Sequence, residues 1–208
     1  MEHNYSYIYG GMNAFEKEVK RWIDFFFASI CLIVFSPLFL ACYIAIKRDN
    51  DGPVIFKQER IGRFGRPFTI YKFRSMMVNA EYKGPQLCND GKDKRLTKTG
   101  KFLREHHLDE LPQLWNIFIG DMAFIGPRPE RKFYIDQIIK IDPRYTYLYQ
   151  IRPGITSMAT LYNGYTDTMD KMLKRLEMDL EYLERRSWWL YAKILGLTFL
   201  KIIFGRKF

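Results

Sequence analysis

The chain has 208 residues, of which 48% are hydrophobic, 17% aromatic and 27% charged, and its formal net charge is +10. This length allows one compact domain with an anchoring segment, and the composition excludes a disordered tail and a multi-span transporter. The positive excess implies an anionic partner, for which nucleic acid, acidic lipid headgroups and phosphorylated substrates are the alternatives.

An almost uninterrupted apolar run extends from Trp22 to Ile46. A run of about 18 or more apolar residues is a candidate membrane helix. Basic residues flank both ends of the run. Because positive residues prefer the cytoplasmic side, a spanning helix would place one of these flanks on the unfavoured side of the membrane. Ser36 and Pro37 stand in the middle, where proline removes a backbone donor and the serine hydroxyl can satisfy a freed carbonyl. The run therefore predicts either a re-entrant helix-break-helix with both chain termini in the cytoplasm or a kinked single span.

The next part of the chain has the pattern of strands and loops. Residues 51–53 predict a turn, and two strand-like stretches follow at 54–58 and 68–73. The glycine-bearing segment between these stretches predicts a short β-hairpin. The polar stretch 79–100 predicts an irregular loop.

Helical patterns then dominate. We expect a helix at 109–119, a short apolar run at 122–125, helices at about 130–141 and 143–150, and a loop at 152–156. The predicted fold class is therefore α+β and mostly helical, with a membrane-associated N-terminal segment.

The C-terminal part predicts two helices. The first is amphipathic, is capped by Asp167 and follows a 3.6-residue apolar period. Its apolar positions are Met169, Met172, Leu173, Leu176, Leu180 and Leu183. The second, at 187–208, combines aromatic and apolar residues with Lys193 and Lys201, which favours a helix lying in the membrane interface. A second span and a buried core helix are the alternatives. We expect two parts, an N-terminal membrane segment (1–50) and a catalytic domain (51–208).

Asp109 and Glu110 form an acidic pair at the start of the helix predicted at 109–119, with Pro112 in its first turn. Taken alone, such a pair is an ordinary helix start. Isolated basic residues beside turn-forming ones indicate a phosphate-binding site around the pair, because the planar guanidinium of arginine suits contact with phosphate oxygens. These basic residues are Lys72, Arg74, Arg95, Arg104, Arg128 and Arg152.

Carboxylates beside such cations indicate a phosphoryl site with a divalent metal, usually Mg²⁺, held by Asp109 and Glu110. Nucleic-acid binders more often show basic runs or a basic helix face, so the pattern does not favour nucleic acid as the partner. The adjacent His106 and His107 point in different directions, which predicts local packing or solvent contact for them rather than a joint metal site.

Segments along nearly the whole chain, in order, resemble the bacterial sugar transferases, specifically the minimal, single-domain form of the monotopic polyprenyl-phosphate phosphoglycosyl transferases. These segments are Arg21 and Asp24 (R-x-x-D), Ser36-Pro37, GPVIFKQERIG (52–62), FTIYKFRSM (68–76), DKRLTKTGKFLR (93–104), LDELPQLWN (108–116), GDMAFIGPRPE (120–130) and RPGIT (152–156). The chain departs from the family pattern at 105–107, where EHH precedes the acidic pair.

The resemblance implies a re-entrant helix broken at Ser36-Pro37 and a catalytic part on the cytoplasmic face of the bacterial inner membrane. It also implies a two-step reaction. Asp109 attacks the sugar-linked phosphorus of a UDP-sugar and releases UMP, and polyprenyl (undecaprenyl) phosphate then takes the phosphosugar from the aspartyl intermediate. Glu110 would assist through Mg²⁺ or proton handling, and Arg128 and Arg152 would serve the phosphates or the uridine.

The resemblance implies the first membrane step of glycoconjugate assembly, so membrane lipids and downstream glycosyltransferases are further candidate partners.

An aspartate with an ordinary pKa near 3.9 is ionised at pH 7 and needs no base to act as a nucleophile. Two like unit charges about 4 Å apart repel by about 4 kcal/mol at an effective dielectric of about 20. Cations must therefore offset the repulsion between the aspartate carboxylate and the anionic diphosphate.

Two other functions remain open. One is a glycosyltransferase that passes the sugar alone and releases UDP. The other is a basic membrane-surface scaffold without catalysis. Residues that select the sugar are expected in the loop at 79–92.

Overall fold

The computed structural model describes residues 11–49, 52–80, 84, 93–164, 166 and 168–203. The described part is mostly helical with two small sheets, as expected for the α+β class. The elements are α1 (Ala14–Val34), α2 (Ser36–Asp49), β1 (Ile55–Ile61), η1 (Arg63–Gly65), β2 (Pro67–Phe73), α3 (Lys98–Glu105), η2 (Leu108–Glu110), α4 (Gln113–Ile119), β3 (Ala123–Ile125), α5 (Lys132–Ile141), η3 (Pro143–Gln150), β4 (Gly154–Thr156), α6 (Met158–Asn163), α7 (Met169–Arg185) and α8 (Trp188–Ile203).

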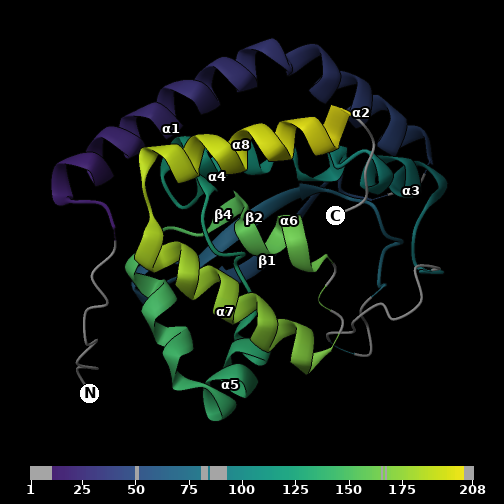
Figure 1. Cartoon of the computed structure of the whole chain (residues 1–208). Coiled ribbons are helices and arrows are strands. Elements are labelled where there is room, and N and C mark those ends of the chain that lie inside the picture. Colours follow the sequence, from purple (N-terminus) through teal and green to yellow (C-terminus); the bar gives the residue numbers. More distant parts are fainter. Residues whose placement is uncertain are drawn as a thin grey trace.

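Helices α1 and α2 form a bent arch along one side of the molecule (Figure 1). They meet at an angle of 60°. Pro37 has no N–H to donate to the Ile33 carbonyl, four residues earlier. The Ser36 hydroxyl donates to this carbonyl instead, at 2.7 Å. The predicted break is confirmed. Among the described helices, none is long and apolar enough to cross a membrane alone, whereas the bent pair meets the criteria of length and composition jointly.

The predicted hairpin is also confirmed. Strands β1 and β2 are antiparallel, with Ile55 opposite Phe73 and Ile61 opposite Pro67. Phe73 packs in an apolar cluster with residues of α2 and α3, so the hairpin joins the arch to the rest of the chain. This position fixes β2, which carries Lys72.

A second sheet was not expected. β3 pairs in parallel with β4, so the prediction of a loop at 152–156 is wrong for Gly154–Thr156. The two segments approach so closely that a Cβ on Gly154 would lie 2.1 Å from the backbone nitrogen of Gly126. The pairing depends on contact between distant segments, and the local pattern carries no signal for it.

Other boundaries differ from expectation in detail. Helix α3 begins at Lys98, inside the predicted loop, because the Thr97 side chain accepts a hydrogen bond from the Gly100 backbone at 2.9 Å and caps the helix. Asp51 of the predicted turn and residues 81–83 and 85–92 of the predicted loop lie outside the described residues. So does Asp167, and Thr168 is the N-cap of α7.

The C-terminal helices have different environments. The apolar period of α7 is confirmed, because Met172, Leu176 and Leu180 are buried against α5 and η3. In α8, Tyr191 and Ile194 are buried in the main core, whereas Trp189 is 70% exposed. Helix α8 is therefore apolar on both its core face and its outer face, and an interfacial location stays a prediction.

Candidate active site

Asp109 and Glu110 lie in the 3₁₀ turn η2, and not in the first turn of α4 as expected. Pro112 explains the difference, because it has no N–H with which to bond the Leu108 carbonyl. That carbonyl instead accepts from the Leu111 backbone at 3.2 Å, which closes a 3₁₀ turn. Helix α4 begins only after Pro112, which is its N-cap. The pair therefore sits on a separate turn directly before α4.

Glu110 is held by two cations. The Lys72 ammonium donates to Glu110 Oε1 at 2.6 Å, and the Arg128 guanidinium lies 3.7 Å from the same oxygen. Burial raises the pKa of Glu110, but Lys72 and Arg128 outweigh burial and lower this pKa to about 2. Glu110 is therefore an ionised carboxylate in a partly buried ion pair.

Asp109 has the opposite environment. Its side chain is buried, and burial together with the charge of Glu110 raises its pKa to about 6, against the opposing effect of Lys72, Arg104 and Arg128. Within the described part of the chain, no group donates a hydrogen bond to this carboxylate. At pH 7 Asp109 is thus mostly ionised and lies in the field of three cations, which suits a carboxylate nucleophile.

The two histidines separate as their adjacency predicts. His106 packs on Phe102, with ring centroids 4.2 Å apart, which confirms local packing. His107 is left-handed (φ 55°), and burial lowers its pKa against the opposing effect of the negative charge of Glu110. Non-glycine residues in this conformation cost about 1–3 kcal/mol and concentrate at functional sites. The sequence places His107 just before the acidic pair, but it carries no signal for this left-handed conformation.

The predicted basic residues fall into two groups. The structure brings Lys72, Arg104 and Arg128 to the acidic pair, as the effects on the Asp109 pKa show. Arg104 also donates to the Ser75 hydroxyl at 3.0 Å, which orients its guanidinium.

The remaining basic residues have other surroundings. Arg95 forms two side-chain bonds of 2.7 Å with Asp93. Arg74 is buried against Gly52, so closely that a Cβ added to Gly52 would lie 2.3 Å from the Nη1 atom of Arg74. Arg152 donates to the Gly120 carbonyl at 2.8 Å, at the far end of α4 from the acidic pair. Their roles toward a substrate stay predictions.

Asn116 is a site-forming residue that sequence reasoning did not select. It is fully buried in α4, its Oδ1 accepts from the Tyr71 backbone at 3.1 Å, and its Nδ2 donates to the Thr69 carbonyl at 2.7 Å. These bonds attach α4 to β2, the strand that presents Lys72 to Glu110. Asn116 stood within a matched motif, but its partners lie 45 and 47 positions away.

A magnesium ion fits the acidic pair only with help from a substrate. In residues 11–49, 52–80, 84, 93–164, 166 and 168–203, no group of three or more His, Cys, Asp or Glu side chains is placed to hold a metal. Mg²⁺ usually takes one or two carboxylates together with substrate phosphates and water. Asp109 and Glu110 supply such a pair of carboxylates.

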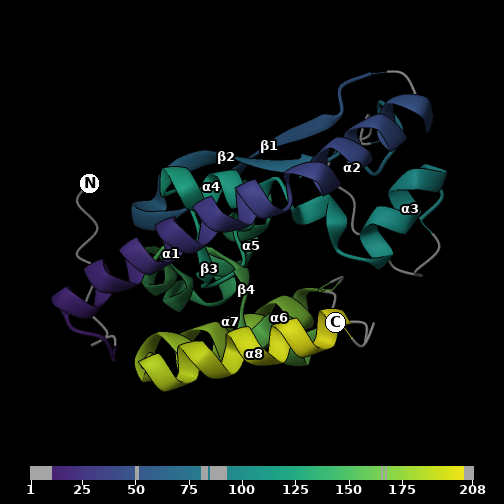
Figure 2. The ribbon, with the colours of Figure 1, turned by 90° about the horizontal axis from the view of Figure 1, so that it is seen from above.

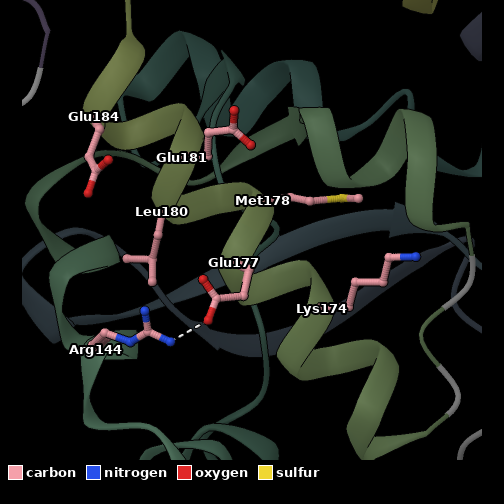
Figure 3. A pocket seen from close by; sticks show the side chains of 7 residues that line it. All are labelled: Arg144, Lys174, Glu177, Met178, Leu180, Glu181 and Glu184. Carbon is pink, nitrogen blue, oxygen red and sulfur yellow. Dashed lines mark hydrogen bonds and ion pairs between the residues drawn. The ribbon is translucent and has the colours of Figure 1, made fainter.

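A surface hollow lies on the outer side of α7, between this helix and η3 (Figure 3). Glu177, Glu181 and Glu184 project from α7 around it, and Arg144 bonds Glu177. The hollow contains none of the predicted site residues. Its charged side chains belong to a solvated helix face, so the acidic pair remains the candidate site.

Comparison with known proteins gives a consistent result. Residues 15–205 match the family model described as bacterial sugar transferase. The chain is 42% identical over 90% of its length to a UDP-N-acetylgalactosamine-undecaprenyl-phosphate N-acetylgalactosaminephosphotransferase of Aeromonas hydrophila. It is 41% identical over 91% of its length to a UDP-glucose:undecaprenyl-phosphate glucose-1-phosphate transferase of Klebsiella pneumoniae.

A third relative, from Caulobacter vibrioides, has the same name as the Klebsiella protein and is 37% identical over 86% of the chain. The chain spans 44% of the Aeromonas protein, 41% of the Klebsiella protein and 67% of the Caulobacter protein. The three names share the acceptor, whereas the sugar is N-acetylgalactosamine in the Aeromonas name and glucose in the other two.

Proposed function

Because the chain belongs to the bacterial sugar transferase family, we propose that it transfers a phosphosugar from a UDP-sugar to polyprenyl phosphate and releases UMP. The observation that carries this proposal is the contrast within the acidic pair. Asp109 is buried among cations with no donor on its carboxylate from the described residues, while Lys72 holds Glu110. The relatives' names support the reaction class, since each names undecaprenyl phosphate and a sugar phosphate transfer.

The proposed reaction has two displacements at one phosphorus atom. In the first, an Asp109 carboxylate oxygen attacks the sugar-linked phosphorus of the UDP-sugar. An acyl-phosphate bond (a mixed anhydride) forms between Asp109 and the phosphorus, the diphosphate P–O bond breaks, and UMP leaves with its electron pair. In the second, a phosphate oxygen of polyprenyl phosphate attacks the same phosphorus. This step releases the Asp109 carboxylate and yields a polyprenyl-diphosphate-sugar.

The neighbouring cations offset the repulsion between Asp109 and the anionic diphosphate. Lys72, Arg104 and Arg128 are the described side chains whose positive charge acts on Asp109. Mg²⁺ held by Asp109 and Glu110 would supply further neutralisation when bound. Chelation of divalent cations should therefore abolish turnover and added Mg²⁺ should restore it, whereas full activity in chelator would remove the metal from the proposal.

Identification of the released nucleotide tests the function. The protein is incubated with polyprenyl phosphate, Mg²⁺ and candidate UDP-sugars, including UDP-glucose and UDP-N-acetylgalactosamine, and the nucleotides are separated. UMP is the expected product. UDP would show transfer of the sugar alone. Retention of every UDP-sugar would contradict the enzyme and favour the basic scaffold.

The pH dependence should follow Asp109. Its pKa is raised to about 6, and only the ionised carboxylate attacks, so the rate of the first step should fall about tenfold per pH unit below that pKa and level off above it. Glu110→Gln removes the negative charge that raises this pKa, so the acid limb should move to lower pH. Lys72→Met removes a positive charge and should move it to higher pH. Single-turnover UMP release measures both shifts, and shifts in one common direction would contradict the assignment.

We also propose that α1, α2 and α8 seat the protein on the cytoplasmic face of the membrane, with α1 and α2 re-entrant. The support is the exposed apolar side chains that these three helices carry. Prominent members are Trp22, Phe26, Ile30, Ile33, Leu40 and Trp189. A cysteine introduced near Met1 should be protected from an impermeant label added outside intact cells. Labelling at that position would instead support a kinked single span.

A further inference from the structure

Two arginines from distant parts of the chain hold the C-terminal end of α4. Arg21 of α1 donates to the carbonyls of Ile117 and Phe118 at 2.8 and 2.9 Å. Arg152, just before β4, donates through Nε to the Gly120 carbonyl at 2.8 Å. Carbonyls in the last turn of a helix lack the helical partners that interior carbonyls have, and these bonds supply donors to them, in addition to the Gly120 backbone, which donates to the Ile117 carbonyl at 3.1 Å.

The close fit of this contact is visible at Gly120. This residue is left-handed (φ 100°), and a Cβ there would lie 3.0 Å from Arg21 Nη2. Helix α4 lies beside α1 in the view from above (Figure 2). The Arg21 guanidinium is partly buried in this contact, and burial and the neighbouring Arg152 charge lower its pKa. Two cations are thus brought together at an end of a helix that carries partial negative charge.

Helix α4 is a short rod between this contact and the acidic pair. Its seven residues span about 10 Å at about 1.5 Å per residue. Asn116 attaches its middle to β2, and Pro112 joins its start to the turn that carries Asp109 and Glu110. Helix α4 also packs in the main core near its middle. A rod held near its middle can tilt, and a tilt would move the acidic pair relative to Lys72 on β2.

We propose that Arg21 and Arg152 are positioning residues that clamp the C-terminal end of α4 and thereby hold Asp109 and Glu110 in register with Lys72. The proposal rests on the proposed function, and it gives α1 a role in the active site in addition to its role at the membrane. It also assigns Arg152 to the scaffold rather than to a substrate phosphate. A misplacement of about 1 Å at a reacting group can cost about 100-fold in rate, so the clamp acts on turnover.

The test separates turnover from substrate binding. In Arg21→Gln and Arg152→Gln, kcat should fall about 10- to 100-fold while KM for the UDP-sugar stays within about twofold. Arg21→Lys should recover part of kcat, because one ammonium can reach one of the two carbonyls. The double variant Arg21→Gln/Arg152→Gln should lose less than the product of the two single effects, since both side chains hold the same end of α4.

The control is Arg185→Gln, in which the replaced side chain is 73% exposed at the end of α7. It should keep wild-type kcat and KM. The fraction of molecules that release UMP in a single turnover corrects each kcat for unfolded protein. A rise in KM without loss of kcat would overturn the proposal and indicate phosphate binding, and unchanged kinetics in both single variants would overturn it too. Failure of the proposed function itself would appear separately, as absence of UMP release from the wild-type protein.

Discussion

Replacement of Asp109 by asparagine is expected to lower turnover at least about 1000-fold, because loss of a catalytic nucleophile removes the reaction path rather than slowing it. Intact mass measurement after mixing the protein with Mg²⁺ and the correct UDP-sugar, without lipid acceptor, should show a phosphosugar adduct on the wild-type chain. The adduct should be missing in Asp109→Asn. Rapid quenching limits its loss by hydrolysis.

This variant should not lose stability. Burial and Glu110 raise the pKa of Asp109, so its ionisation opposes folding increasingly as pH rises from its unfolded pKa toward about 6. Asparagine removes that penalty, and the unfolding midpoint at pH 7 should stay unchanged or rise. Asp136→Asn, at an exposed position of α5, is the matched control and should keep full turnover. An adduct that persists in Asp109→Asn would place the nucleophile elsewhere.

Glu110→Gln is expected to lower turnover at least about 100-fold and, unlike Asp109→Asn, to destabilise the protein. Glu110 is the ionised partner of Lys72 at 2.6 Å, and both side chains are less than one-fifth exposed. Removing one member of a buried ion pair leaves the other charge unpaired, which costs about 3–5 kcal/mol. Denaturant unfolding and steady-state UMP release measure the two effects.

A second variant separates these effects. Lys72→Met/Glu110→Gln removes both charges and should regain much of the stability, but it should not regain turnover. The control is Glu181→Gln on the exposed face of α7, which should change neither quantity. Near-normal turnover in Glu110→Gln would remove Glu110 from the catalytic machinery and leave it a structural partner of Lys72.

Several features of the fold were predictable because their causes are local. Ser36 and Pro37 are neighbours, so the break between α1 and α2 follows from a missing donor and an adjacent hydroxyl. The hairpin follows from two strand-like stretches and the short segment between them. The buried face of α7 follows from the spacing of its apolar residues. In each case the interacting residues lie within a few turns or one short connection.

The sequence predicted the acidic pair as a candidate site, but it did not predict the different environments of Asp109 and Glu110. Both residues are carboxylates on one turn. The approach of Lys72 from β2 and of Arg128 after β3 makes Glu110 an ion-pair partner, whereas burial and the charge of Glu110 raise the pKa of Asp109. The roles differ because electrostatic effects depend on distance in space, which the order of residues does not specify.

The sequence by itself determined the helical character, the bent N-terminal segment, the hairpin and the position of the acidic pair. Only the tertiary structure decided which cations reach that pair, that Gly126 and Gly154 bring two strands together, and that Arg21 meets a carbonyl 96 positions away. The physical reason is the range of the interactions. Propensity, capping and periodicity act over a few residues, whereas salt bridges and caps between elements depend on packing of the whole chain.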